Sequence, residues 1–351
     1  MTENIKIIKL GSQSGNTCPS TTSNTVRHQN NSEPLVIVPV IARLFACYLP
    51  GYQPPKWVGQ VEFQPAVWKY ADRAIVYYPN GTNLSEVKKL ATHREPTNLG
   101  GDKLYNRDQL LAEYGYTESP YQIGSPNIAI FCRTPVITGR TISPARVKYA
   151  NILSAIAPAL DTQDQPDYRY LASDPRQPKR CYKYACMMAA AFRHIRICFL
   201  EGGFRRLIMT GLGMGNFKFY AEELDIDAEH IFRECLFRGL GDLFIDSGDN
   251  DGHSGREMWL NCIRTVVLRE HIPVELRQRV VLKALDIQTL LDNLNQAELD
   301  ESLIINAWDP FSMVGNGNAN DISLDGYVGR ISAAGVLSWP ITNPQIQWRA
   351  D

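Results

Sequence analysis

Residues 179–217 read KRCYKYACMMAAAFRHIRICFLEGGFRRLIMTGLGMGNF, and this stretch decides the fold. Its first part, residues 179–201, predicts a helix that is apolar almost all round near its middle, as helices packed against a sheet are. Residues 206–210 predict a short strand, and glycines follow at every second position from 211 to 215. A helix that leads into a strand and then into a glycine loop is typical of α/β proteins.

Apolar runs on both sides of this stretch predict further strands. Continuous apolar strands that alternate with helices indicate a mostly parallel sheet covered by helices on both faces. The expected strands are residues 35–38, 74–78, 127–132, 150–156 and 303–308, and the expected helices after the glycine loop are residues 220–239, 255–269, 273–294 and 325–337.

The length and composition bound the domain organisation. The chain has 351 residues, of which 44% are hydrophobic and 21% charged, so it is neither a disordered chain nor a coiled coil. We expect a mobile polar arm over residues 1–33, an N-terminal extension packed on the core over residues 34–124, and the core itself over residues 125–351. The candidate functional residues lie in the last of these three parts, residues 125–351.

Charge, apolar stretches and cysteines exclude several classes of protein. The 36 basic and 37 acidic residues leave a net charge of −1, so we expect no nucleic-acid partner held by overall charge. No apolar stretch reaches the length of a membrane span, and residues 1–32 lack the apolar core of a secretory signal. The eight cysteines form no CxxC pair, which favours reduced thiols in a cytoplasmic setting and no metal site.

The glycine loop, residues 210–217, is the first candidate site. Glycines at alternate positions let the backbone approach a ligand and point its N–H groups inward, which suits a phosphate or diphosphate. The spacing is neither that of a dinucleotide fingerprint nor that of a P-loop. The alternative is a tight strand-to-helix turn with no ligand.

The second candidate site is the loop that begins on the strand at 303–308 and continues to residue 326. It gathers four asparagines and three aspartates within twenty-one residues. Carboxylates and carboxamides at the end of a strand can bind ribose hydroxyls, orient water or hold a metal. The alternative is an Asx-rich turn that caps a helix, with Asp321 as the N-cap.

Both loops resemble parts of the macrodomain family. Asn306-Ala307, the Gly/Asn loop and Leu324-Asp325-Gly326 resemble the ribose-facing strand and loop of macrodomains, and residues 211–217 resemble their diphosphate loop. The likeness spans about residues 125–345. More narrowly, the chain looks like the macrodomain-type ADP-ribosyl hydrolases among secreted bacterial effector proteins, which are related to poly(ADP-ribose) glycohydrolases.

The resemblance implies a fold. It implies a three-layer α/β/α arrangement with a mixed sheet and extra N-terminal strands. The Asn306 segment follows the glycine loop in this chain, whereas it precedes that loop in ordinary macrodomains. A rewired or circularly permuted sheet is therefore implied.

The resemblance also implies roles for single residues. The backbone of the glycine loop would hold the diphosphate, Phe217 would stack near the distal ribose, and Asn306 would contact that ribose. Bond cleavage at its anomeric carbon would pass through a cationic sugar, which carboxylates stabilise. The implied catalytic residues are Asp309, Asp321 and Asp325, and the implied ligand-binding residues are Gly211, Gly213, Met214, Gly215, Asn216, Phe217, Asn306, Asn316 and Asn318.

Three functions follow as hypotheses. The first is a hydrolase that releases ADP-ribose from a modified protein such as ubiquitin, with no cofactor and with the host cytosol as its location if the chain is a secreted effector. The second is a non-catalytic reader of ADP-ribose, and the third a glycosidase that cleaves NAD. We also expect five basic residues to gather on the glycine-loop side: Arg193, Arg196, Arg205, Arg206 and Lys218.

Overall fold

A computed structural model describes somewhat more than half of the chain. The continuous described ranges are residues 70–85, 87–88, 127–138, 146–245, 255–261, 266–285 and 287–308. Shorter described pieces are residues 6–8, 23–25, 314, 324–325, 328, 332, 334–338, 343 and 345–351. All statements below concern these residues.

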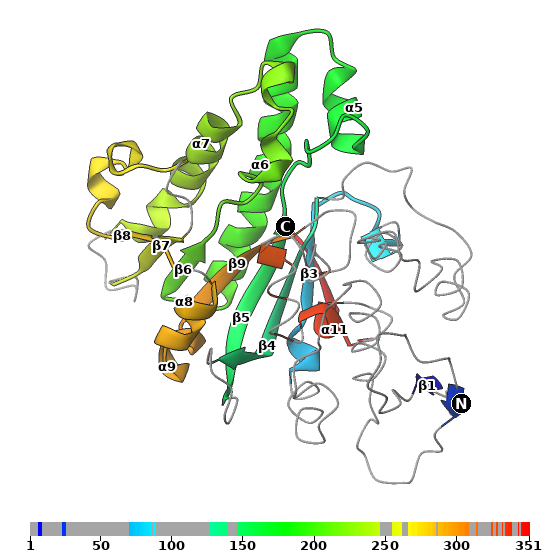
Figure 1. Ribbon diagram of the computed structural model, residues 1–351, viewed down its shortest axis with the longest axis vertical. Helices are drawn as coiled ribbons and strands as arrows, with labels where there is room; N and C mark the ends of the chain where they lie inside the picture. Colours follow the sequence, from blue (N-terminus) through cyan, green and yellow to red (C-terminus); the bar gives the residue numbers. More distant parts are fainter. Residues whose placement is uncertain are drawn as a thin grey trace, which may run out of the picture.

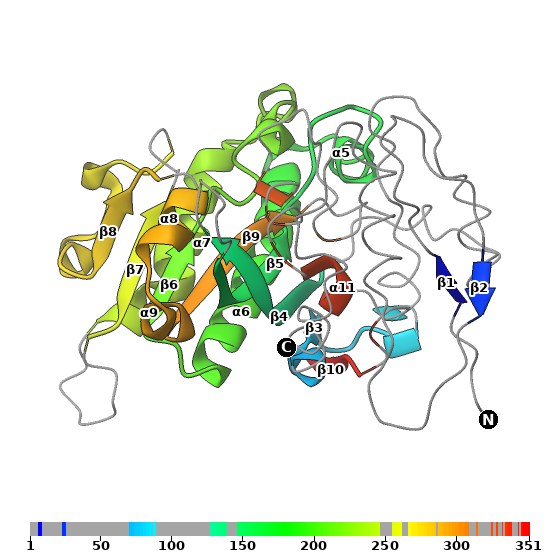
Figure 2. The same cartoon turned by 60° about the horizontal axis from the view of Figure 1, so that its bottom comes forward.

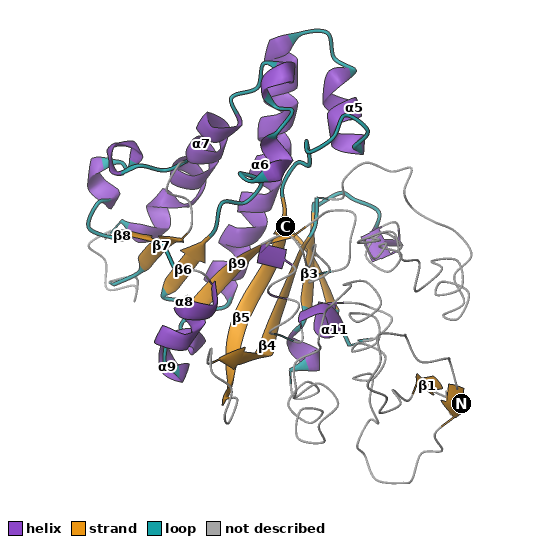
Figure 3. Ribbon diagram, viewed as in Figure 1, coloured by secondary structure: helices purple, strands orange, loops and turns teal. Residues whose placement is uncertain are grey.

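The centre of the fold is an eight-stranded mixed sheet with the order β10-β3-β4-β5-β9-β6-β7-β8 (Figures 1 and 3). β5, β9, β6, β7 and β8 are parallel to one another, β4 is antiparallel to both β3 and β5, and β10 is parallel to β3. The bounds are β3 Ile75–Tyr78, β4 Ala129–Thr138, β5 Arg146–Ile156, β6 Arg206–Met209, β7 Glu257–Asn261, β8 Val280–Lys283, β9 Ser302–Trp308 and β10 Gln347–Ala350. β1 (Lys6–Ile8) and β2 (Ser23–Thr25) form a separate antiparallel pair.

Helices cover both faces of the sheet, as Figure 2 shows, so the α/β class with a mixed sheet is confirmed. α6 (Gln177–Glu201) and α7 (Ala228–Leu240) bury their apolar sides on one face, with α5 (Pro166–Ala172) beside α6. α8 (Ile287–Asn293), α9 (Gln296–Asp300) and α11 (Ala334–Ser338) contribute to the core on the other face. Single turns of 3-10 helix lie at Ala71–Arg73, Asn216–Lys218, Glu222–Leu224, Gly241–Phe244, Arg269–His271 and Val274–Leu276.

Helix ends follow local sequence signals. α6 starts with Pro178 in its first turn and ends at a glycine pair, of which Gly203 takes a left-handed φ of +63°. α7 is capped by Asp227, whose carboxylate accepts from the backbone N–H of His230 at 2.9 Å. α9 begins with a capping box in which Asn295 and Glu298 each accept from the other's backbone N–H.

Most of the expected strands and the central helix are confirmed, and two expected helices are wrong. The helix at 179–201 and the strands at 74–78, 150–156, 206–210 and 303–308 correspond to α6, β3, β5, β6 and β9. The expected helix at 255–269 contains strand β7, and the one at 273–294 contains strand β8; α-helix is found only in the last part of the second range, as α8, among the described residues. These short strands at the end of the sheet are defined by their pairing, β7 with β6 and β8 with β7, which local composition does not reveal.

The order of the strands places β9 between β5 and β6, both of which precede it by more than ninety residues in the sequence. β5 leads through α5 and α6 to β6, and β9 inserts later between β5 and β6. The connections after β5 and β6 lead to α6 and α7 on one face, whereas β9 is followed by α11 on the other. In open α/β sheets, ligands bind where neighbouring connections leave to opposite faces, at the carboxyl ends of the strands. The topology therefore points to the carboxyl end of β9.

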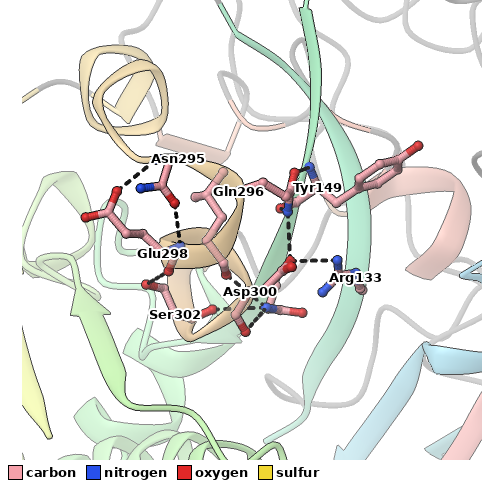
Figure 4. A network of polar contacts seen from close by, with 9 residues as sticks. Arg133, Tyr149, Asn295, Gln296, Glu298, Asp300 and Ser302 are labelled. Carbon is pink, nitrogen blue, oxygen red and sulfur yellow. Dashed lines mark hydrogen bonds and ion pairs between the residues drawn. The ribbon is translucent and has the colours of Figure 1, made fainter. Parts of the chain in front are cut away.

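A polar network at the opposite, amino end of the same strands fixes α9 and β9 to the sheet (Figure 4). Arg133 of β4 pairs with Asp300 at 2.6 Å. The side-chain amide of Asn151 donates to the carbonyl oxygens of Leu299, Asp300 and Ser302 at 3.1–3.2 Å. These contacts satisfy carbonyls at the turn from α9 into β9, so this end of the sheet is a structural anchor.

His194 of α6 is fully buried, as expected for a core histidine, beside Asp351 at the end of β10. Its Nε2 atom lies 3.3 Å from Asp351 Oδ2. Burial lowers the pKa of His194 to about 4, and the neighbouring Asp351 carboxylate only partly offsets this effect. The imidazole is therefore neutral in the folded protein at neutral pH.

We expect this histidine to make the protein less stable in acid. The unfolded pKa is about 6.5, so the contribution to stability is present above that pH and is lost as the pH falls toward 4. The free energy of unfolding should fall by about 2 kcal/mol between pH 8 and pH 5 on account of His194 alone. Urea unfolding at both pH values checks this: His194→Phe should remove this part of the pH dependence, and His230→Gln at an exposed position should keep it. Equal pH dependence of His194→Phe and the wild type would contradict it.

None of the helices in the described ranges has the length and apolar character that a membrane crossing requires.

Candidate functional site

Two loops lie against each other at the carboxyl ends of β5 and β6, the strands on either side of β9. The segment after β5 includes Leu160, whose backbone N–H donates to Phe217 O at 2.8 Å and whose carbonyl accepts from Tyr220 N–H at 2.9 Å. Phe217 and Tyr220 belong to the segment after the glycine loop of β6. These bonds hold the two loops together beside the end of β9, where the topology points to a ligand site.

The glycine loop has a fixed backbone shape. Met214 N–H donates to Gly211 O at 2.9 Å, and Leu212 N–H to Thr210 O at 2.8 Å. The Thr210 hydroxyl donates to Ile305 O of β9 at 3.1 Å, which fastens the start of the loop to the central strand. The loop is therefore bonded both internally and to the sheet.

Gly213 is the position in the loop that requires glycine. Its φ is +72°, in the left-handed region that L side chains rarely adopt. A Cβ atom at this position would lie 2.6 Å from the Cβ of Ala157, in the segment after β5. Glycine at 213 thus permits both the turn and the close approach of the two loops.

Four backbone N–H groups of the loop have no acceptor among the described residues. They belong to Gly213, Gly215, Asn216 and Phe217. Gly215 and Asn216 are exposed, and Phe217 is half-buried. Successive N–H groups of this kind attract an anion, and phosphate oxygens are the ligands they suit best. The loop can therefore bind a phosphate or diphosphate through its backbone.

Asn306 lies in β9, fully buried, opposite Ser154 of β5 in the parallel register. Its Nδ2 atom donates to Ser154 Oγ at 3.1 Å and to Asp325 Oδ1 at 2.9 Å. Its Oδ1 atom accepts no hydrogen bond from any residue within the described ranges. A buried acceptor without a partner is costly, so Asn306 Oδ1, near the carboxyl end of β9, is a candidate for contact with a ligand.

The expected site residues divide into three groups. The glycine loop follows β6 and Asn306 lies in β9, so the two are on adjacent strands of the sheet. The side chain of Met214 is buried in the core beneath the loop. Asp325 is buried and bound to Asn306. The remaining expected residues, Asp309, Asn316, Asn318 and Asp321, lie outside the described residues.

Two further polar residues lie at this edge of the sheet, and one of them, Ser154, was not anticipated from the sequence. Ser154 stands in an apolar strand, and its hydroxyl is a partner of Asn306. Asp161 follows the segment tied to the glycine loop, and its Oδ1 atom is buried with no hydrogen-bond partner in the described part of the chain. The only sequence signal for Ser154 is a lone hydroxyl within an otherwise apolar strand.

The expected cluster of basic residues beside the glycine loop is wrong. Arg205 and Arg206 stand at the amino end of β6, the end opposite the loop, and each pairs with a carboxylate there. Arg193 and Arg196 pair with Asp351 and Asp242. Lys218 does follow the loop, but its ammonium group pairs with Glu229 of α7. Attraction of an anion at this site therefore rests on the backbone N–H groups.

Two of the described thiols, those of Cys132 and Cys235, are poor nucleophiles. Burial raises the pKa of the Cys132 thiol to about 12 and that of the Cys235 thiol to about 11, so both stay protonated at neutral pH. Cys181, Cys186 and Cys198 are also free thiols. Within the described ranges, no three His, Cys, Asp or Glu side chains gather as ligands around a metal ion would.

The arrangement thus combines donors for an anion with an acceptor for a hydroxyl group, on adjacent loops and strands. No protein-family model and no curated protein matches the sequence.

Proposed function

We propose that the chain binds ADP-ribose at the carboxyl ends of β5, β9 and β6 and releases it from a modified protein. The proposal rests on two features on adjacent strands of the sheet. The loop after β6 has four N–H groups without an acceptor among the described residues, and β9 carries the buried Oδ1 atom of Asn306. The resemblance of both loops to macrodomain motifs supports the same ligand.

The chemistry of ADP-ribose fits the two parts of the site. Its diphosphate carries only acceptors and negative charge at neutral pH, which the N–H groups of Gly213, Gly215, Asn216 and Phe217 complement. The distal ribose carries hydroxyl groups that can donate to Asn306 Oδ1. The glycine loop follows β6, the strand beside β9, so the bound ligand would have to extend from the loop, where its phosphate lies, to Asn306, where its sugar lies.

Hydrolysis of the ADP-ribosyl bond needs carboxylates near the anomeric carbon. The departing sugar gains positive charge in the transition state, and a carboxylate both stabilises that charge and activates water. Asp309, Asp321 and Asp325 are the candidates for these roles. The substrate would be an ADP-ribosylated protein such as ubiquitin, and ADP-ribose would be the product.

A non-catalytic reader of ADP-ribose is the second candidate, and one observation favours it. The one candidate carboxylate in the described ranges, Asp325, is buried and accepts a hydrogen bond from Asn306. A carboxylate held in this way supports the binding residue and is less available to orient water.

Two measurements on the full chain separate these functions. Calorimetry with ADP-ribose tests binding, and we expect a dissociation constant in the micromolar range, about −8 kcal/mol. Release of ADP-ribose from ADP-ribosylated ubiquitin tests catalysis, and Asp309→Ala or Asp321→Ala should lower its rate by roughly 100-fold or more. Asp164→Ala, at an exposed side chain at the same end of the molecule, is the matched control and should keep the rate.

The outcomes are distinct. Binding without release at any pH identifies a reader. Cleavage of free NAD identifies the glycosidase instead. If ADP-ribose does not bind, the proposal is wrong, and if Asp309, Asp321 and Asp325 can each be changed to alanine without effect on release, the assigned catalytic residues are wrong.

A further inference from the structure

The side-chain amide of Asn306 is held by two partners from two different parts of the chain. Ser154 lies directly across the β5–β9 pair, and its Oγ atom is 3.1 Å from Asn306 Nδ2. Asp325 comes from the region after β9, and its Oδ1 atom is 2.9 Å from the same nitrogen. Ser154 and Asn306 are fully buried, and Asp325 is 3% exposed.

The chemistry of the partners fixes the orientation of the amide. An ionised carboxylate can only accept a hydrogen bond, so the nitrogen of Asn306, rather than its oxygen, must face Asp325. A flipped amide would place two oxygen atoms against each other at this distance. The two hydrogens of Nδ2 are then both used, one by Asp325 and one by Ser154. Only the acceptor, Oδ1, is left for a ligand.

We propose that Ser154 and Asp325 are positioning residues that hold the Asn306 amide so that it offers only an acceptor to the ligand. The site then selects a ligand group that donates a hydrogen bond, which for ADP-ribose is a hydroxyl of the distal ribose. A phosphate or carboxylate group at the same place would meet Oδ1 and the Asp325 carboxylate, both of which repel it. This inference rests on the proposed function, and it assigns Asp325 to orienting Asn306 rather than to water.

The test compares two ligands in each variant by calorimetry on the full chain. ADP-ribose contacts both the glycine loop and Asn306, whereas ADP lacks the distal ribose and contacts only the loop. We expect Asp325→Asn, in which two amides can pair in either direction, to weaken ADP-ribose binding by about five- to tenfold and ADP binding by less than about twofold. Ser154→Ala should have the same pattern with a smaller loss, and Ser154→Thr, which keeps the hydroxyl, should restore binding.

A purely structural role gives a different result. Distortion of the sheet would weaken ADP and ADP-ribose alike, and equal losses would overturn the inference while leaving the proposed function intact. A wild-type chain that binds neither ligand would overturn the proposed function and this inference together.

A second measurement needs no ligand. In nuclear magnetic resonance spectra of the wild type, both Nδ2 protons of Asn306 should exchange slowly with solvent, and Ser154→Ala should speed the exchange. Fast exchange in the wild type would overturn the positioning role on its own.

Discussion

Replacement of Gly213 by alanine is expected to lower the free energy of unfolding by about 2–4 kcal/mol and to weaken ADP-ribose binding by roughly 100-fold or more. The φ of +72° is strained for any L side chain, and the new Cβ would lie 2.6 Å from the Cβ of Ala157. The loop must then move away from the segment after β5. Two or more hydrogen bonds from its N–H groups to a phosphate would be lost.

Gly203→Ala is the matched control for this substitution. Gly203 has a similar φ of +63°, but a Cβ there meets no heavy atom within 4 Å, and the residue lies between α6 and β6, away from the site. Its cost should be limited to backbone strain of about 1–2 kcal/mol, with binding unchanged. Urea unfolding and calorimetry check both variants. Equal losses of stability, or ADP-ribose affinity retained in Gly213→Ala, would show that the contact with Ala157 does not shape the loop.

The second large effect is expected for Asn306→Asp, which puts two buried carboxylates side by side. The new carboxylate would stand where Nδ2 now donates to Asp325 Oδ1 at 2.9 Å. We expect the free energy of unfolding at pH 8 to fall by about 3–5 kcal/mol, because a buried donor is replaced by a like charge.

The effect should depend on pH in a defined direction. The carboxylate pair in the folded variant would retain one proton, so its pKa would be raised above the unfolded value of about 3.9. Stability is then lost as the pH rises through the raised pKa, and it is partly regained at pH 5. Urea unfolding at pH 5 and pH 8 measures this difference.

The double variant Asn306→Asp with Asp325→Asn is the control, because it exchanges the two groups and restores one amide beside one carboxylate. It should recover most of the lost stability at pH 8. If it is as unstable as Asn306→Asp alone, the contact between residues 306 and 325 does not account for the loss.

The central part of the fold is predictable from the sequence because its signals are long and continuous. The helix over residues 177–201 and the strand over residues 302–308 are apolar over most of their buried surface, the buried polar exceptions being His194, Ser302 and Asn306. β7, with the sequence EMWLN, and β8, with VVLK, are too short for such a signal. Together with their charged and aliphatic neighbours they resemble a helix until the pairing of β7 with β6 and of β8 with β7 is known.

The candidate site is predictable only in part, for a related reason. The glycine loop and Asn306 stand out individually because glycines at alternate positions and an asparagine in an apolar strand are unusual. Ser154 does not stand out, since its role depends on a parallel register between strands 150 residues apart. The expected basic cluster failed because neighbours in sequence, such as Arg206 and Gly211, lie at opposite ends of one strand.

β9 lies between β5 and β6 in the sheet but follows both in the sequence, and this has a consequence for folding during synthesis. A ribosome that has synthesised residues 1–301 has produced both loops of the site and the strands β5 and β6, but not the strand that joins them. Until β9 emerges, β5 and β6 each present an unpaired edge, the kind of surface at which nascent chains aggregate. The proposed binding of ADP-ribose therefore becomes possible only after β9 has emerged from the ribosome.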